Sequence, residues 1–335
     1  MSRYIPQVLG VGMLQMISVN NLKKSYGDFC AVNDISFAIQ KGEIFGFLGP
    51  NGAGKTSTIN MMTGLSRATA GEIMIDGIDV KRETKKAQAI MGIVADESNL
   101  YNEMDGFENL CFCAALYGMP KSERESKAWQ LLAQFRLKDA GKRPVKAYSK
   151  GMRRKLTIAA ALMHAPQILF LDEPTSGIDV ESSRQIREMI VELKHKGTTI
   201  FLSTHYIEEA ERACDRIAFI AAGRIVASGS IPELMNSVSH GHTISLVTAK
   251  NAEAFVDELQ SCFEASKVTI QSDHSLVMVS ERRIALFPVM EFFHEKGIDI
   301  YEARELRPSL EDVFVKLTGI ESSVLRKDKE MGKRQ

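Results

Sequence analysis

Long apolar runs are missing from this chain. No stretch of its 335 residues approaches the length of about 18 apolar residues at which a membrane-spanning helix is expected. The apolar segment at residues 8–14 is short, and no small-residue cleavage site follows it, so we do not expect a signal peptide. Met13 or Met16 is an alternative start, because the first strand-like run begins at Met16.

Cysteine is scarce and unpaired. The five cysteines, at positions 30, 111, 113, 214 and 262, are odd in number and scattered. Cys111 and Cys113 fall in an expected helix, where residues two apart point in different directions, so they do not form a metal pair. The pattern predicts reduced cytosolic thiols that serve as small apolar side chains.

An excess of charge is also missing, because 42 basic residues balance 42 acidic ones. This balance argues against a protein held to nucleic acid by its overall charge, although a local basic patch stays possible. We therefore expect no nucleic-acid partner.

The most informative stretch is GPNGAGKT, followed by Ser57. It matches the pattern G-x-x-x-x-G-K-[ST], and it lies between an apolar run that predicts a buried strand and a segment with helical spacing. A strand, a glycine-rich turn and a helix start present backbone N–H groups to phosphate oxygens. The predicted nucleotide-binding residues are Gly49, Pro50, Asn51, Gly52, Ala53, Gly54, Lys55, Thr56 and Ser57. Lys55 is placed to reach the β- and γ-phosphates and the Thr56 hydroxyl to ligate Mg²⁺.

Two carboxylates follow the run ILFL at residues 168–171. The run predicts a central parallel strand buried on both faces, with Asp172 and Glu173 at its carboxyl end, where open α/β sheets bind ligands. A Mg-nucleotide site needs a carboxylate for the metal and a base for water, and Asp172 and Glu173 suit these roles in that order. The other interpretation is that both acids cap the following helix.

A second buried strand at 198–204 places His205 level with these carboxylates. Ser149 is expected at the start of a helix that runs to His164, and the box Ser122-Glu123-Arg124-Glu125 predicts the start of another. Taken alone, Tyr26 is an ordinary half-buried tyrosine beside a turn.

The order of motifs predicts an α/β P-loop NTPase fold with two domains. A 1–15 extension precedes a nucleotide-binding domain at 16–230, in which residues of about 96–160 form a helical subdomain. Residues of about 242–318 have the order β-α-β-β-α-β followed by one more helix, which predicts a small α+β domain of ferredoxin-like type at 231–320. The charged segment 321–335 is expected to be disordered.

Taken together, these motifs resemble the ATP-binding subunits of ABC transporters. The chain is most similar to the bacterial drug- and antibiotic-exporter branch (daunorubicin-resistance-like), whose membrane domains are separate polypeptides. The resemblance covers residues of about 16–230, and the 231–320 segment, with its SLEDVF sequence, is similar to the extra domain of that branch.

The resemblance assigns roles to further residues. Tyr26 takes the place of the aromatic that stacks on adenine, and His205 that of the switch histidine on the γ-phosphate. Ser149 and Gly151 of Tyr148-Ser149-Lys150-Gly151-Met152 match the signature, which meets the ATP held by a second subunit. Asp179 belongs to the loop that communicates between the two sites, while Asp172 corresponds to the metal carboxylate and Glu173 to the general base.

One segment departs from the family pattern. The family usually places a glutamine between the sheet and the helical subdomain, whereas this chain has Asp96 there in one register and Glu97 in the other. A carboxylate can ligate Mg²⁺, but it also puts negative charge near the γ-phosphate and the attacking water.

The resemblance implies an ATPase that binds ATP and Mg²⁺ and energises export through separate membrane-spanning permease subunits. It implies a homodimer or heterodimer of nucleotide-binding subunits, located in the cytoplasm at the inner face of the cell membrane. Two other functions stay open: a soluble ABC ATPase acting on ribosomes or DNA, and a regulatory module that binds ATP but hydrolyses it weakly. The exported substrate is chosen by the permease, so this chain does not reveal it.

Overall fold

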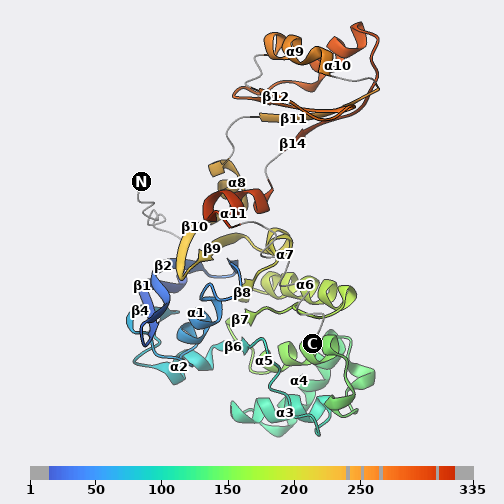
Figure 1. Cartoon of the computed structure of the whole chain (residues 1–335). Helices are drawn as coiled ribbons and strands as arrows, with labels where there is room; N and C mark the ends of the chain where they lie inside the picture. Colours follow the sequence, from blue (N-terminus) through green and yellow to red (C-terminus); the bar gives the residue numbers. More distant parts are fainter. Residues whose placement is uncertain (1–14, 239–241, 250–252, 264–266, 307–308, 321–335) are drawn as a thin grey trace. The chain divides into compact units, whose positions relative to one another are not determined.

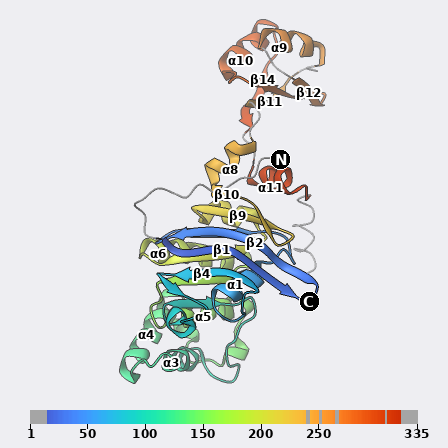
Figure 2. The ribbon, with the colours of Figure 1, turned by 90° about the vertical axis from the view of Figure 1, so that its left-hand side faces the viewer.

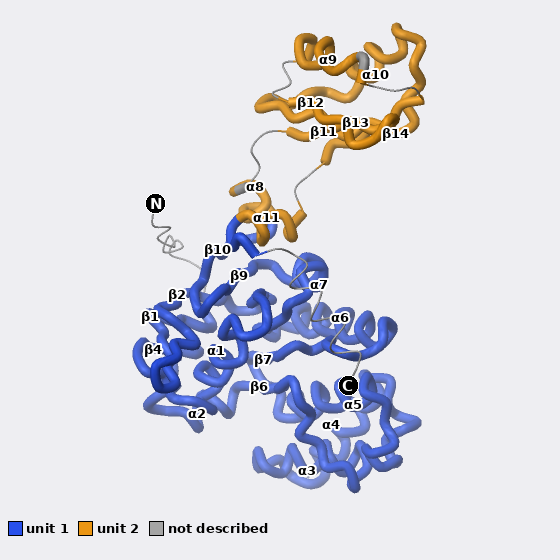
Figure 3. Tube along the Cα trace, viewed as in Figure 1, with its two compact units in different colours: residues 1–231, 317–335 blue, residues 232–316 orange. Residues whose placement is uncertain are grey.

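The computed structural model describes residues 15–238, 242–249, 253–263, 267–306 and 309–320. Residues 1–14 of the predicted extension 1–15 and the predicted segment 321–335 lie outside these residues, while Gln15 begins the first strand. Two compact units make up the chain, one of residues 1–231 with 317–335 and one of residues 232–316 (Figure 3). In the described part, no helix has both the length and the apolar character needed to cross a membrane.

A six-stranded sheet forms the centre of the first unit, in the order β10-β9-β3-β8-β7-β6. Its strands are β3 (Ile44–Leu48), β6 (Met91–Val94), β7 (Ile168–Asp172), β8 (Thr199–Thr204), β9 (Arg216–Ala221) and β10 (Arg224–Ser230). All neighbours pair in parallel except β9 and β10. Every residue of β3, β7 and β8 is buried, as the apolar runs predicted for a sheet covered on both faces.

An antiparallel sheet in the order β2-β1-β4-β5 packs against the central one (Figure 2). Its strands are β1 (Gln15–Tyr26), β2 (Phe29–Gln40), β4 (Ala70–Ile75) and β5 (Ile78–Asp79). Between them, Phe37 of β2 stacks on Phe45 of β3 with ring centroids 5.5 Å apart. Helix α1 (Lys55–Met62) adds Ile59 and Met62 to the same core. The core therefore holds the strand and the helix on either side of residues 49–54 in fixed positions.

The segment of about 96–160, which we predicted to be a helical subdomain, folds mainly as helices beside the central sheet (Figure 1). The subdomain holds α3 (Gly106–Leu116), α4 (Lys121–Gln134) and α5 (Lys150–Ala161), with short 3₁₀ turns η1 (Lys138–Ala140) and η2 (Val145–Ala147). The remaining helices of this unit are α2 (Thr84–Ala89), α6 (Val180–His195) and α7 (Ile207–Ala213).

The two predicted helix starts have different outcomes. Ser149 is the N-cap of α5, and its hydroxyl accepts a hydrogen bond from the Met152 amide at 3.2 Å. The prediction that Ser122 caps α4 is wrong, because α4 begins at Lys121 and its N-cap is Pro120, with no side-chain cap. Proline fixes φ near the helical value, so the chain enters the helix two residues earlier than the box indicated.

The second unit has the predicted β-α-β-β-α-β order, with strands paired antiparallel in the order β12-β13-β11-β14. It contains β11 (His242–Thr248), η3 (Glu253–Phe255), α9 (Val256–Cys262), β12 (Lys267–Ser272), β13 (Ser275–Ser280), α10 (Leu286–Glu295) and β14 (Ile300–Leu306). Leu246, Met278 and Phe293 lie in its core. Helices α8 (Ile231–Val238) and α11 (Leu310–Thr318) flank this fold in the sequence, and α8 was not predicted.

Candidate active site

The loop between β3 and α1 is built around two glycines. A Cβ on Gly49 would lie 2.2 Å from the Ile220 carbonyl oxygen, and one on Gly54 would lie 2.6 Å from the Ala31 carbonyl oxygen. Gly54, with a φ of 105°, is also the N-cap of α1, which no side chain caps. The first amides of α1 are therefore available to phosphate oxygens.

Lys55 points back into this loop. Its side chain is 6% exposed, and its ammonium donates to the Gly49 carbonyl oxygen at 2.7 Å and the Pro50 carbonyl oxygen at 3.3 Å. The same nitrogen lies 3.2 Å from Glu173 Oε1. The cation is thus held between the phosphate loop and the carboxyl end of β7.

Both carboxylate oxygens of Asp172 accept hydrogen bonds. The Thr56 hydroxyl donates to Oδ2 at 2.9 Å, and the Ser203 hydroxyl donates to Oδ1. Ser203 belongs to β8, the strand beside β7, so the sheet itself aligns these groups. Thr56 and Asp172, two of the three residues predicted to face the metal, are in direct contact.

Glu173 is held on both sides. Its Oε1 pairs with Lys55, and its Oε2 lies 2.8 Å from Nδ1 of His205. Burial alone would raise the pKa of Glu173, but the hydrogen bond from His205 and the positive charge of Lys55 outweigh it and lower the pKa below the ordinary value of 4.5. The carboxylate is therefore ionised at neutral pH.

The backbone at this position and the far nitrogen of His205 are both unusual. Glu173 has a φ of 47°, a left-handed conformation that is strained for a residue other than glycine. His205 Nε2 is buried and finds no hydrogen-bond partner among the described residues. Such strain and such an unpaired buried atom are typical of functional sites, and Nε2 is free to meet a ligand oxygen.

These groups open into a cavity of about 310 Å³. Its lining combines the phosphate loop with the carboxylates and with aromatic residues of the antiparallel sheet: Tyr26, Phe29, Ala31, Asn51, Gly52, Gly54, Lys55, Thr56, Ser57, Asp96 and Glu173. Tyr26 is 51% and Phe29 64% exposed. They are opposite each other where β1 and β2 join, so the cavity has a polar end for phosphates and an aromatic end that suits a nucleobase.

Of the two carboxylates that the sequence left open, Asp96 lines the cavity and Glu97 does not. Burial raises the pKa of Asp96; Arg154 opposes this rise, and the charges of Asp172 and Glu173 add to it. Asp96 therefore lies in the electrostatic field of the other site residues.

Ser149, Gly151 and Asp179 lie apart from this cavity. Ser149 and Asp179 are the exposed N-caps of α5 and α6, and Asp179 accepts from the Ser182 amide at 2.8 Å. Gly151 packs against the start of α6, where a Cβ would lie 2.2 Å from Ser182 Oγ. The start of α5 thus forms a second, separate group of predicted residues.

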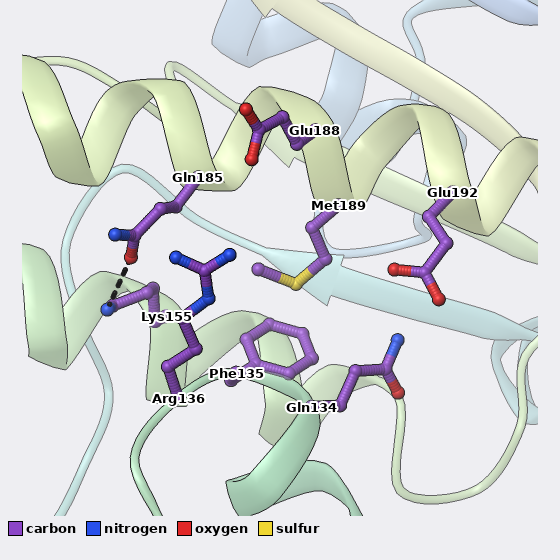
Figure 4. A pocket seen from close by; sticks show the side chains of 8 residues that line it. All are labelled: Gln134, Phe135, Arg136, Lys155, Gln185, Glu188, Met189 and Glu192. Carbon is purple, nitrogen blue, oxygen red and sulfur yellow. Dashed lines mark hydrogen bonds between the residues drawn. The ribbon is translucent and has the colours of Figure 1, made fainter.

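A smaller hollow lies between the end of α4 and helices α5 and α6, and it contains none of the predicted residues (Figure 4). Lys155 donates to Gln185 Oε1 at 3.0 Å across it, and Arg136 and Met189 point into it. This contact ties α5 to α6.

Sequence reasoning missed Phe29 and Ser203. Phe29 could have been found as the strand partner of Tyr26 across a short turn. Ser203 carries no signal of its own, because only the parallel pairing of β7 and β8 brings it to Asp172.

The fold and the cavity together define a P-loop ATPase, with a phosphate loop, a hydroxyl–carboxylate pair and a buried glutamate at the end of a neighbouring parallel strand. The ABC transporter family model matches residues 32–176. The chain is 36% identical to the linearmycin resistance ATP-binding protein LnrL of Bacillus subtilis, covering 91% of this chain and 98% of that protein. It is 35% identical to the Nod factor export ATP-binding protein I of Cupriavidus metallidurans, covering 92% and 99%.

Among solved structures, an ATP-binding subunit of an ABC transporter superposes with a TM-score of 0.61 at 31% identity, over 66% of this chain and 92% of that one. The chain belongs to the ABC transporter family and is an ATP-hydrolysing subunit of it. The predicted family, fold and enzyme class are confirmed.

Proposed function

We propose that the chain energises export through a separate membrane-spanning permease, and that it works as a head-to-tail pair of nucleotide-binding chains. The observation that supports a pair of chains is that the signature residues of this chain lie apart from its own cavity. The cavity is lined by residues of the phosphate loop and by Asp96 and Glu173, while Ser149 and Gly151 lie at the start of α5, outside it. A second chain would bring its own Ser149 and Gly151 to the γ-phosphate.

The proposal that the chain takes part in export is supported by its relatives. Proteins that match nearly their whole length to this chain are named for linearmycin resistance and for Nod factor export. The partner would be a permease made of separate chains, with this subunit at the inner face of the membrane, where ATP is available. That permease, and not this chain, would determine which substrate is exported.

Within the cavity, the side chains divide the work. Tyr26 and Phe29 stack on the base, the loop amides and Lys55 hold the phosphates, and Glu173 orients the attacking water and accepts its proton. His205 fixes Glu173 through Nδ1, and when the ring carries protons on both nitrogens its Nε2 would donate to the γ-phosphate. Because these groups are already in place, they stabilise the developing charge with little reorganisation.

The donors at the end of β7 fit Mg²⁺. Thr56, Asp172 and Asp96 supply hydroxyl and carboxylate oxygens, the ligands that this hard cation prefers. In the described part of the chain, no three His, Cys, Asp or Glu side chains are grouped to hold a metal by themselves. This agrees with an ion held jointly with phosphate oxygens, where it would neutralise their charge.

Purification of the tagged protein from detergent-solubilised membranes tests the transport role. We expect a multi-span permease to copurify, and recovery of ribosomes or DNA instead would overturn it.

The Glu173→Gln variant tests the role of the base. It is expected to lose about 100-fold or more in ATP turnover, because no group remains to take the proton. Its affinity for ATP should stay equal or rise, because Lys55 is released from its ion pair. Rapid-quench hydrolysis and binding of a fluorescent ATP analogue measure the two quantities, and normal turnover would remove Glu173 from this role.

A further inference from the structure

Arg154 on the second turn of α5 is a buried cation outside the cavity described above. Its side chain is 6% exposed. All of its hydrogen bonds in the described part of the chain go to main-chain carbonyl oxygens. Nε donates to Pro174 at 3.0 Å, Nη1 to Asp96 at 3.0 Å and to Ala95, and Nη2 to Asp172.

These carbonyls belong to two loops that leave neighbouring parallel strands. Residues 95 and 96 follow β6, and residues 172–174 end β7 and follow it. The first loop carries Asp96 into the cavity, and the second carries Glu173. One guanidinium on a helix of the helical subdomain therefore joins both loops to that helix.

A cation at this place is not needed for packing alone. Burial lowers the pKa of Arg154, which shows that desolvation opposes the charge, and the carboxylates of Asp96, Asp172 and Glu173 compensate it in part. An apolar side chain of similar volume would avoid this cost. The planar fork of arginine, however, offers donors in several fixed directions, which the single ammonium of lysine cannot do.

We propose that Arg154 is a positioning residue for ATP hydrolysis: it holds the Asp96 loop and the Glu173 loop in register, so that α5 and the two carboxylates move together. The proposal rests on the roles of Asp96 and Glu173 given above. It explains how the start of α5, which carries Ser149, is connected mechanically to the hydrolytic groups of its own chain.

The test compares Arg154→Met and Arg154→Lys with Lys155→Met. Lys155 is the matched control, because it is the next residue of α5, is also buried, and donates to Gln185 on α6 instead of to the two loops (Figure 4). The measurements are the dissociation constant of a non-hydrolysable ATP analogue, kcat, and hydrogen exchange of backbone amides. For exchange, the segments of interest are residues 94–97, 172–176 and 50–57.

For Arg154→Met, we expect kcat to fall about 100-fold, the loss typical of a misplacement of about 1 Å, with ATP-analogue affinity within about threefold. Exchange should accelerate in residues 94–97 and 172–176 and stay unchanged in residues 50–57. Arg154→Lys should recover part of the rate. Lys155→Met should keep kcat within about twofold even where its melting temperature falls.

The proposal is overturned if kcat of Arg154→Met stays near that of the unchanged protein, or falls only in proportion to ATP-analogue affinity. It is equally overturned if exchange in the two loops is unchanged, or if it rises throughout the first unit. If Arg154→Met does not fold, Arg154→Lys is judged by the same criteria. A wild-type protein without ATPase activity would refute the proposed function, whereas the exchange data would still decide whether Arg154 joins the loops.

Discussion

At the scale of single residues, the central feature is that Glu173 has a partner on each oxygen. Lys55 comes from the phosphate loop and His205 from the end of β8, so the position of the Glu173 carboxylate depends on both of these elements. The motif letters were enough to predict Lys55, Asp172, Glu173 and His205, because each follows directly from a strand or loop pattern. Ser203, Phe29 and Arg154 were not predicted, because their roles depend on which strands and loops are neighbours in space.

The ion pairs of Glu173 make its contribution to stability depend on pH. Its pKa is lowered in the folded protein, so the contribution is complete above the ordinary carboxyl value of 4.5 and is lost as the pH falls through the folded-state pKa. The difference in unfolding free energy between wild type and Glu173→Gln should therefore stay constant above about pH 5 and shrink as the pH falls below about 4.5. Urea unfolding measures this difference, and a value that does not change with pH would contradict the expectation.

Asp96 is expected to act on the metal side of the site. In Asp96→Gln, the Mg²⁺ concentration that gives half-maximal ATPase activity should rise by about three- to tenfold, because a charged ligand is replaced by an amide. Glu97→Gln is the control, since Glu97 does not line the cavity. If this Mg²⁺ concentration changes equally in both variants, Asp96 is not a metal ligand.

At the scale of elements, the close approach of α5 to α6 decides how the signature residues are presented. Gly151 is needed there because Ser182 occupies the space that a Cβ would fill. Sequence patterns predicted most strands and helices of both units, since buried strands and amphipathic helices differ in period. They failed at the start of α4, where Pro120 and not Ser122 is the N-cap, and they gave no prediction for α2, α7 and α8.

Gly151→Ala should destabilise the protein by about 1–3 kcal/mol through this clash. A second change, Ser182→Gly, removes both atoms nearest to the new Cβ and should restore part of the loss. Thermal or urea unfolding of the two single variants and the double variant gives the coupling free energy between the two substitutions. Additive losses would show that the clash is not the cause.

At the scale of the whole molecule, the cavity beside the phosphate loop and the signature residues Ser149 and Gly151 do not meet in the described part of the chain. The proposed pair supplies two sites, each built from both chains. Nothing in the sequence of one chain fixes whether the partner is identical, which is why the motifs predicted a dimer but left its composition open.

Mixing two inactive variants tests an identical pair. Lys55→Ala damages the cavity and Ser149→Phe the signature, so in a mixed pair one of the two sites is intact. Equal amounts should recover up to about one quarter of the wild-type sites. A mixture of Lys55→Ala with Glu173→Gln is the control, because both changes fall in the same cavity and no intact site can form. Equal recovery in both mixtures, or none in the first, would exclude the arrangement.

The hydroxyl groups of Thr56 and Ser203 also bear on the order in which the metal and the nucleotide bind. They donate one hydrogen bond to each oxygen of Asp172, so both oxygens already have a partner within the protein before any ligand binds. A bare cation would have to disrupt these bonds without the phosphate oxygens that complete its coordination. The metal should therefore bind together with the nucleotide. Without ATP, the protein should bind little Mg²⁺ when the free Mg²⁺ concentration changes.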